Sequence, residues 1–599
     1  MLKEIKELGE YKTSTGASGI EPFLEIPYKD KEGSNYFFIP FEIQGDGTVK
    51  YKGSIEVEPI HSEDEYLTKY LYDAISSGSG IYGSPTAKFT ELEKTLPKKI
   101  KNFFGKNNIK KFEITDEEKD FLESIRKEFE NNYDAISNDL NELLRQAGKK
   151  NVIGVLFYDK DGTKKYIGEI KTFVKIFEQF IANKLDLIDG TCFLCGKKGK
   201  VTVNAISKVA FFYSIDKPGF IVGGFNRSEA YKDFAICPEC FVKVQLGTNL
   251  LENDLTFKFY GLRYWLIPNF FLSDKDKRKE ILDILIENKN KNIGIKSGMK
   301  RLTDDEREIL DIISDLNDYV SFNFLFYAPK GNGRIIKALI EDVLPSRLHT
   351  IFEAKKRIDS LPIVETITHK KTVRYFDFGY IREFFKGTKG DTKNKEFLAI
   401  IDSIFKDKLI NKGFFLNFVM SVLRKSMAND DYFSFKTKEA FVSFLFLKKL
   451  RLIKEDTMDD LSNSAFEEIF NRFDNSFGTN LSRGLFLLGA ATGMLESIQM
   501  SERNTSSPPI DKKLKNLKLT EKDVLSLLPE LEVKFKQYKS WGKDKQLVLK
   551  EAAGYLLAAG RNWKMSVDEI NFYIAAGLLY KNEIRSIAQQ KTNGGDKNE

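Results

Sequence analysis

The four cysteines of this 599-residue chain constrain its fold most strongly, because all of them fall into two Cys-x-x-Cys pairs. The pairs are Cys192 with Cys195 and Cys237 with Cys240. A two-residue spacer aims both sulfur atoms of a pair at one point, so two pairs can surround a single tetrahedral ion. The pattern predicts a closed, structural site for Zn²⁺. The alternative interpretations are two redox dithiols or four unrelated buried thiols.

The residues beside the cysteines predict how this site is built. Gly196 directly follows the first pair and supplies the backbone freedom that a tight turn over the sulfur atoms requires. The apolar pattern after Phe241 predicts a helix at the second pair, and the start of a helix favours thiolate charge. This layout is typical of treble-clef or ribbon-like zinc sites. The spacer of 41 residues between the pairs is longer than in common zinc ribbons.

Length and composition indicate a folded, multidomain protein. A single hydrophobic core rarely grows beyond roughly 250–300 residues, and 42% apolar with 13% aromatic residues are enough for large cores. Charges interrupt the first ten residues where a signal peptide needs an apolar run, and no segment approaches the roughly 18 apolar residues of a membrane span. We therefore expect a cytoplasmic protein without a membrane partner, in keeping with reduced cysteines.

The charges of the chain matter more by their position than by their sum. The net charge of +7 is a small excess of 94 basic over 87 acidic residues. One basic cluster is interleaved with Phe103, Phe104 and Phe112, and a second follows a loop at 501–509. Basic runs suit phosphate contacts, although most such runs are solvated faces. The candidate nucleic-acid-binding residues are Lys98, Lys99, Lys101, Lys106, Asn107, Asn108, Lys110, Lys111, Lys512, Lys513, Lys515 and Lys518.

Local patterns predict two hairpins and one long helix in the first third of the chain. The hairpins turn at Gly45–Gly47 and at Asp161–Gly162, between segments of alternating or apolar character. Thr115 and Glu118 form a capping-box pattern, which predicts an amphipathic helix that runs toward Gly148.

The fold class that follows is α+β, with a mixed amino-terminal domain that holds the hairpins and the four-cysteine site, and a helical bundle at the carboxyl end. Helical patterns take over from about Ile281. Four regions are expected: an α+β domain at 1–185, a zinc-binding insertion at 186–250, a mixed but mostly helical region at 251–413 and a helical bundle at 414–599.

The sequence favours a binding protein over an enzyme. Its three histidines, His61, His349 and His369, form no His-Glu-x-x-His motif and none adjoins an aspartate, so the usual ligand sets of metal-dependent hydrolases are missing from the sequence. Scattered carboxylates can still meet in a fold. The alternatives are therefore a zinc-containing enzyme that processes nucleic acids and a zinc-stabilised scaffold that binds only protein.

Four segments around and after the second cysteine pair resemble a known family. They are Phe212–Phe220, Gly224–Cys240, Phe257–Pro268 and Ile335–Leu348. In their order and spacing they are similar to the large subunit of type I-B CRISPR surveillance complexes, the Cascade complexes, which is the eighth Cas family in its b variant. The resemblance is strongest over residues 150–350 and diffuse over the helical carboxyl end.

The resemblance implies a non-catalytic subunit of a crRNA-guided complex in antiviral defence. The amino-terminal domain would contact the PAM-proximal target duplex and aid R-loop opening. The helical domain, which resembles the small subunit, would hold the displaced single strand. The implied partners are crRNA, double-stranded target DNA, the other backbone and small subunits of Cascade, and a recruited helicase-nuclease that does the cutting.

Met458 is a candidate internal translation start, because in the resembled family a small subunit can arise from within the large-subunit gene. The residues from Lys454 to Thr457 can be encoded by a purine-rich ribosome-binding sequence just before this methionine codon. The alternative is an ordinary linker methionine.

Overall fold

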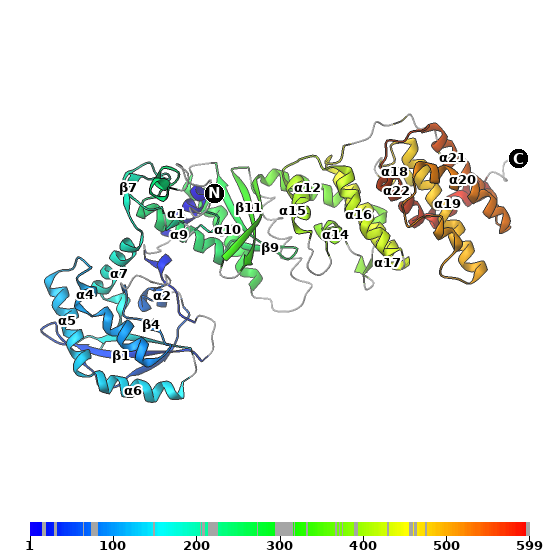
Figure 1. Cartoon of the computed structure of the whole chain (residues 1–599). Coiled ribbons are helices and arrows are strands. Elements are labelled where there is room, and N and C mark those ends of the chain that lie inside the picture. Colours follow the sequence, from blue (N-terminus) through cyan, green and yellow to red (C-terminus); the bar gives the residue numbers. More distant parts are fainter. Residues whose placement is uncertain are drawn as a thin grey trace. The chain divides into compact units, whose positions relative to one another are not determined.

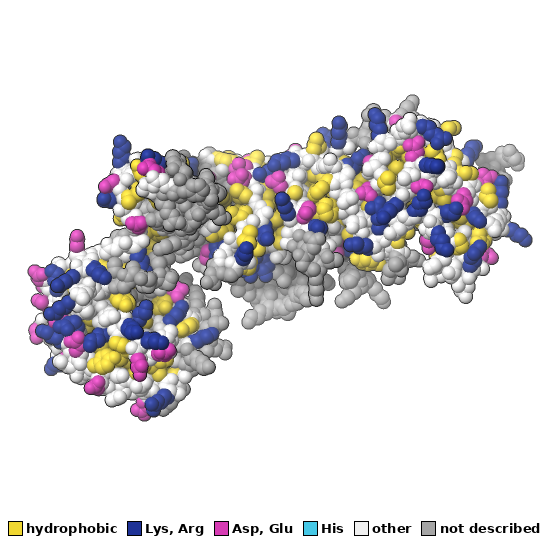
Figure 2. Space-filling model, in the orientation of Figure 1, with side chains coloured by type: hydrophobic (Ala, Val, Ile, Leu, Met, Phe, Trp, Pro, Cys, Tyr) yellow, Lys and Arg dark blue, Asp and Glu magenta, His cyan; other side chains and the backbone are white. Residues whose placement is uncertain are grey.

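The chain folds into two compact units, Met1–Leu255 and Thr256–Glu599 (Figure 1). Basic and acidic side chains are scattered over the visible surface among hydrophobic and uncharged ones (Figure 2). The four regions expected from the sequence stay a prediction. The computed structural model describes residues 1–14, 20–28, 33–63, 65–73, 82–147, 150–203, 205–206, 210–213, 226–271, 274–293, 316, 318–330, 333–365, 368–369, 372–373, 375–387, 393–427, 430–454, 459, 464–473 and 476–594.

Unit 1 alternates short strands with helices. Its strands are β1 (Asn35–Ile43), β2 (Val49–Tyr51), β3 (Glu56–Pro59), β4 (Ala87–Lys88), β5 (Asn151–Tyr158), β6 (Lys164–Tyr166), β7 (Ile188–Thr191) and β8 (Lys198–Val201). Its helices are α1 (Leu2–Ser14), η1 (Glu21–Phe23), α2 (Glu65–Tyr70), α3 (Leu92–Thr95), η2 (Leu96–Lys101), α4 (Lys106–Ile109), α5 (Asp116–Asn131), α6 (Tyr133–Gln146), η3 (Ile167–Glu169), α7 (Lys171–Lys184), η4 (Arg227–Lys232) and α9 (Pro238–Asn253).

A six-stranded mixed sheet forms the centre of unit 1. β1 pairs in parallel with β5, in a register that sets Asn35 beside Asn151, and antiparallel with β2 and β3. β5 pairs antiparallel with β4 and β6. The β1–β2 and β5–β6 pairs confirm the two predicted hairpins. Gly47 and Gly162 adopt φ angles of +84° and +78° in the turns, a conformation that side chains disfavour.

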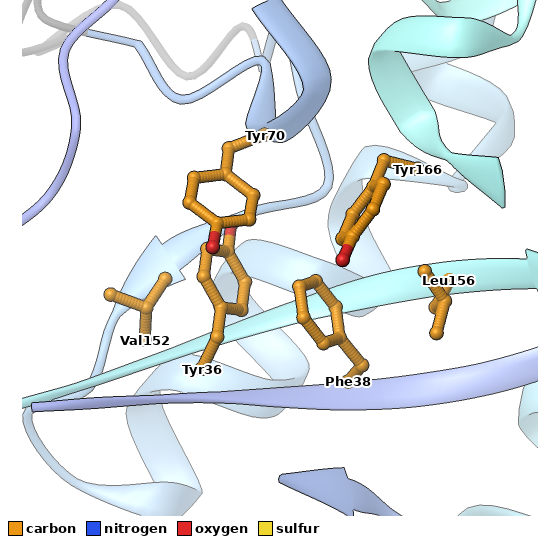
Figure 3. Close-up of a cluster of buried hydrophobic side chains, with 6 residues drawn as sticks. All are labelled: Tyr36, Phe38, Tyr70, Val152, Leu156 and Tyr166. Carbon is orange, nitrogen blue, oxygen red and sulfur yellow. The ribbon is translucent and has the colours of Figure 1, made fainter. Parts of the chain in front are cut away.

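An aromatic cluster packs on this sheet (Figure 3). Tyr36 and Phe38 of β1 stack with ring centroids 4.2 Å apart, and Tyr70 of α2 tilts over Tyr36 at 4.8 Å. Tyr166 of β6 meets Phe38 edge to face at 5.7 Å. Because these four rings are at most 9% exposed, they belong to the hydrophobic core and offer no open face for stacking a base.

The predicted capping box opens helix α5, but the helix does not continue toward Gly148. The hydroxyl of Thr115 accepts the N–H of Glu118 at 3.3 Å, and the Glu118 carboxylate accepts the N–H of Thr115 at 2.7 Å. The helix is interrupted at Asn132, which lies between α5 and α6. Asn132 has φ −106° and ψ 12°, outside the helical range, and the carbonyl of Glu128 accepts both its backbone N–H at 3.1 Å and its side-chain amide at 2.8 Å.

Unit 2 begins with a sheet and continues as helices. Its strands are β9 (Thr256–Phe259), β10 (Leu262–Phe270), β11 (Val320–Lys330), β12 (Gly333–Val343), β13 (Thr368–His369) and β14 (Thr372–Val373). Its helices are α10 (Lys275–Ile293), α12 (Pro345–Asp359), α13 (Pro362–Glu365), α14 (Phe378–Phe384), α15 (Asn394–Phe405), α16 (Lys412–Ser426), α17 (Asp430–Lys449), α18 (Glu467–Asn471), α19 (Asn480–Arg503), η5 (Pro509–Lys512), α20 (Glu521–Gln537), α21 (Lys543–Ala558), α22 (Val567–Leu579) and α23 (Lys581–Gly594).

The sheet of unit 2 is antiparallel, in the order β12-β11-β10-β9. Tyr260 and Gly261, both with positive φ, make the two-residue turn between β9 and β10. Phe324 of β11 lies 5.2 Å from Phe405 of α15, which packs this helix against the sheet. The long strands β11 and β12 contradict the expectation that helical patterns take over from about Ile281. The apolar run of β11 fits a buried strand as well as a helix, and β12 pairs with it as a mostly exposed outer strand.

Helix α19 is the centre of the carboxyl-terminal helices. It is buried along most of its length and packs against α21, α22 and α23. Gly489 of α19 and Gly577 of α22 permit the closest approach, because a methyl group at either position would overlap a backbone carbonyl of the other helix. Close backbone approach and a continuous apolar surface together hold this bundle.

The observed architecture confirms the predicted fold class. A mixed amino-terminal region with sheets and the four cysteines precedes a helical carboxyl-terminal region. Among the helices of the described residues, none combines the length and the apolar character that a membrane crossing requires.

Candidate metal centre and nucleic-acid interface

The four cysteines meet where a short hairpin touches the start of a helix. Cys192 and Cys195 lie in the turn between β7 and β8. Cys237 is the N-cap residue of α9, and Cys240 lies in its first turn. Backbone hydrogen bonds of 2.8 and 3.1 Å join Thr202 to the residue before Cys237, so the chain on both sides of the cluster is fixed.

The sulfur geometry fits one tetrahedral ion. All four Sγ atoms lie within 4.8 Å of one another, and those of Cys195 and Cys237 are 3.8 Å apart. Metal–sulfur bonds of about 2.3 Å in a tetrahedron require sulfur–sulfur separations of about 3.8 Å. Cys192 and Cys240 are 1% and 2% exposed, whereas the other two lie nearer the surface. The four thiols can therefore hold a metal ion.

Backbone groups of the turn favour a thiolate at the first cysteine. Gly196 adopts a φ of +73°, as the sequence predicts, and its N–H donates to the carbonyl of Cys192 at 2.8 Å. Burial raises the pKa of the Cys192 thiol. Hydrogen bonds from the backbone N–H groups of Cys237 and Cys195 lower this pKa by more, so that it lies at about 7. Burial and the neighbouring sulfur atoms raise the pKa of Cys240. N–H groups aimed at sulfur are typical of metal-binding turns.

Helix α9 carries the amino-terminal helix α1 on its surface. The two helices cross at Gly9 and Gly247, where a methyl group on either residue would overlap a backbone carbonyl oxygen of the other helix. At the edge of the crossing, the ammonium of Lys243 donates to Glu10 at 3.4 Å and to Glu239 at 3.0 Å. The start of the chain therefore packs on the helix that supplies two of the four sulfur atoms.

The first basic cluster presents its lysines to solvent and buries its aromatic residues. The rings of Phe103, Phe104 and Phe112 are at most 5% exposed, so they cannot stack on bases. Lys101 is half-buried, and its ammonium lies 3.7 Å from the carboxylate of Glu130. The exposed candidates, which can reach phosphates, are Lys98, Lys99, Lys106, Asn107, Lys110 and Lys111.

Asn108 holds this cluster together from inside. It is 5% exposed, and its amide oxygen accepts the N–H of Tyr82 at 3.0 Å. Its amide nitrogen donates to the carbonyls of Tyr82 at 3.1 Å and Phe103 at 3.0 Å. These contacts satisfy the side chain within the fold, so its predicted contact with nucleic acid stays untested.

Two exposed lysines of the second cluster form ion pairs with carboxylates of α20. Lys513 lies 3.1 Å from Glu530, and Lys515 lies 2.6 Å from Asp523. The hydrogen bond from Lys515 is the largest of the effects that lower the pKa of Asp523 to about 2. The remaining candidates of this cluster, Lys512 and Lys518, are exposed.

A left-handed turn fixes the backbone of the second cluster. Lys515, Asn516 and Leu517 have consecutive φ angles of 48°, 53° and 55°. This conformation costs about 1–2 kcal/mol for each such residue. The guanidinium of Arg424 donates twice to the carbonyl of Leu517, at 3.1 and 3.0 Å, and once to Asp568 at 2.6 Å. The turn is therefore held by its surroundings in one geometry.

Four functional candidates beside this turn were not predicted from the sequence. The carboxylate of Glu521 accepts the N–H groups of Asn562 at 3.1 Å and Trp563 at 3.0 Å, which brings the loop at 560–566 to the start of α20. Trp563 is partly buried; Arg561 and Lys564 lie near it in sequence, and Lys518 and Lys522 lie near Glu521 in sequence. We call this set of residues the Trp563 surface: Lys518, Lys522, Arg561, Trp563 and Lys564.

Acidic groups near the Trp563 surface are engaged in internal contacts. Asp568 accepts from Arg424, Glu569 pairs with Lys412 at 2.6 Å, and Glu521 accepts from the backbone. Lysine and arginine side chains are spread over the visible face of the carboxyl-terminal helices (Figure 2). The Trp563 surface thus combines exposed cations with one indole ring, the two elements that bind single-stranded nucleic acid.

Three family models match nearly the whole chain. They describe the amino-terminal, central and carboxyl-terminal domains of the CRISPR-associated protein TM1802, and they match residues 1–179, 189–343 and 376–592. The chain belongs to this family. It is the type I-B large-subunit family, Cas8b, so the resemblance inferred from the sequence is confirmed. Among curated proteins, none matches the chain.

Met458, the candidate internal start of this family member, lies outside the described residues. Its role stays a prediction.

Replacing Cys237 and Cys240 with serine tests the metal centre. We expect the purified chain to lose its metal ion and residues 186–250 to lose protection from amide hydrogen exchange, because a structural four-cysteine site holds on the order of 10 kcal/mol of folding free energy. The control K197Q changes the same turn and keeps all four thiols, so it retains the metal. An unchanged metal content in the double serine variant would contradict the site.

Replacing Gly247 with alanine tests the crossing of α1 and α9. The added methyl overlaps the carbonyl of Ile5, so we expect a loss of about 1–3 kcal/mol and faster amide exchange in both helices. The matched control is G554A in α21, where a methyl group meets nothing within 4 Å. That control should be neutral or stabilising by up to about 1 kcal/mol. Equal protection of α9 in G247A and the unmodified chain would refute the tight crossing.

Proposed function

We propose that this chain is the non-catalytic large subunit of a crRNA-guided type I-B surveillance complex in antiviral defence. Family membership supports the CRISPR association. The Trp563 surface is the observation that carries the nucleic-acid role, because its cations suit phosphates and its indole suits an unstacked base. In this proposal unit 2 holds the displaced single strand of the target.

The exposed lysines of the first basic cluster support a contact with duplex DNA. They lie on η2, on α4 and beside them, and their long side chains can reach successive phosphates without reading bases. We propose that they position the PAM-proximal duplex and aid R-loop opening. Sequence specificity in such a complex comes from pairing between crRNA and target. The other Cascade subunits and a recruited helicase-nuclease complete the proposed assembly.

We further propose that the ion at the four cysteines is Zn²⁺ and that it is structural. Four soft thiolates at tetrahedral spacing suit Zn²⁺, and a full set of protein ligands leaves no position for a substrate or a reactive water. Elemental analysis of the purified chain should give one zinc per chain. A nuclease assay with added metals tests the alternative of an enzyme: metal-dependent turnover of DNA by the isolated chain would overturn the non-catalytic role.

Neutralising three lysines of the Trp563 surface tests strand binding. For K518Q/K522Q/K564Q we expect the slope of log affinity against log salt for single-stranded DNA to fall by roughly 2, since each lost phosphate contact removes about 0.7. The control K275Q/K279Q/K395Q removes the same charge from exposed lysines elsewhere in unit 2. An identical loss in both variants would mean that only net charge matters, which would argue against a specific strand site.

Copurification tests the assembly. The tagged chain, expressed with its neighbouring genes, should recover RNA of uniform length that carries repeat sequence, together with several proteins. Recovery of protein partners without RNA would favour the protein-only scaffold. Recovery of the chain alone would contradict membership of a surveillance complex.

A further inference from the structure

The turn that bears the first two cysteines also displays an aromatic ring to solvent. Phe193 is 68% exposed, although Cys192 beside it is 1% exposed. The N–H of Phe193 donates to the carbonyl of Ala235 at 2.8 Å, so the backbone under the ring is tied to the segment that leads into α9. Because the backbone under this exposed phenylalanine is already fixed, little backbone freedom remains to be lost when a ligand binds.

Two further rings support Phe193 from behind. Its ring centroid lies 4.8 Å from that of Phe234, which in turn lies 5.8 Å from that of Tyr213. The hydroxyl of Tyr213 donates to the carbonyl of Phe234 at 3.4 Å. Both supporting rings are partly exposed. The three rings form a continuous aromatic edge, with Phe193 at its outer end.

The hairpin that carries Phe193 also bears three lysines, Lys197, Lys198 and Lys200, whereas burial and the nearby Asp233 raise the pKa of the Tyr213 phenol. Lys197 lies 3.4 Å from Glu239, and Lys200 lies 3.1 Å from Asp189. These pairs join side chains that are 59–83% exposed, so they are weak and can exchange for a phosphate. Lys198 is exposed, and no ion pair is found for it within the described residues. From Gly190 to Ile215 the sequence has lysines and no acidic residue.

We propose that the metal-bound turn is a second binding site for single-stranded nucleic acid, in which one base stacks on Phe193 and the adjoining phosphates contact Lys197, Lys198 and Lys200. A flat exposed ring with cations on the same hairpin matches a base and its backbone. A duplex keeps its bases stacked inside and cannot use the ring. A protein partner would have to bury these lysines at a cost. The inference rests on the proposed nucleic-acid role and adds a site in unit 1 to it.

The test uses the full-length, metal-loaded chain and a fluorescent oligothymidylate, with a DNA hairpin duplex as the second probe. F193A should weaken binding of the single strand by about 5- to 150-fold, the range that corresponds to the loss of one base stack. F193W should restore it. The matched control F271A removes another exposed phenylalanine, 55% exposed, that lies in unit 2, and it should bind like the unmodified chain. Metal content and amide exchange of α9 should be unchanged in F193A.

Each contrary outcome points to a different error. If the unmodified chain binds the single strand and F193A binds it within twofold, the Phe193 site is wrong while the proposed function stands. If F193A weakens the duplex as much as the single strand, stacking is wrong. If the unmodified chain binds neither probe, both the site and the proposed nucleic-acid role are overturned.

Discussion

The meeting of four sulfur atoms is the contact on which the arrangement of the β7–β8 turn, α9 and α1 depends. It joins the turn between β7 and β8 to the start of α9 across a spacer of 41 residues. Helix α9 then carries α1 through the crossing of Gly9 and Gly247. A metal ion bound there would supply on the order of 10 kcal/mol, as much as the net stability of many domains. The same turn that the ion would stiffen is the one that displays Phe193.

Pairing of charges, more than their number, decides which surfaces of this chain can bind a polyanion. Lys513 and Lys515 belong to a basic run, yet both form ion pairs with carboxylates of α20. The pair of Lys515 lies at the start of the left-handed turn. The lysines around Trp563 lie where neighbouring acids already have internal partners. The small net charge of +7 is therefore compatible with local clusters of positive charge, such as the Trp563 surface.

The sequence predicts those parts of the structure that depend on a few neighbouring residues. The turns at Gly47 and Gly162, the cap at Thr115 and the two cysteine pairs are of this kind. The break at Asn132 was missed because it lies in the backbone conformation of one residue, with φ −106° and ψ 12°, and no glycine or proline marks it in the sequence. The Trp563 surface was missed because it forms through Glu521, a contact over more than 40 residues.

Crosslinking of the target-bound complex by ultraviolet light, followed by mass spectrometry of this chain, tests its role as a nucleic-acid-binding subunit most directly. We expect nucleotide adducts on the peptide that contains Trp563 and on the peptide that contains Phe193, because a stacked base lies in van der Waals contact with the ring. Abundant adducts on the other subunits of the same sample, with none on this chain, would contradict that role.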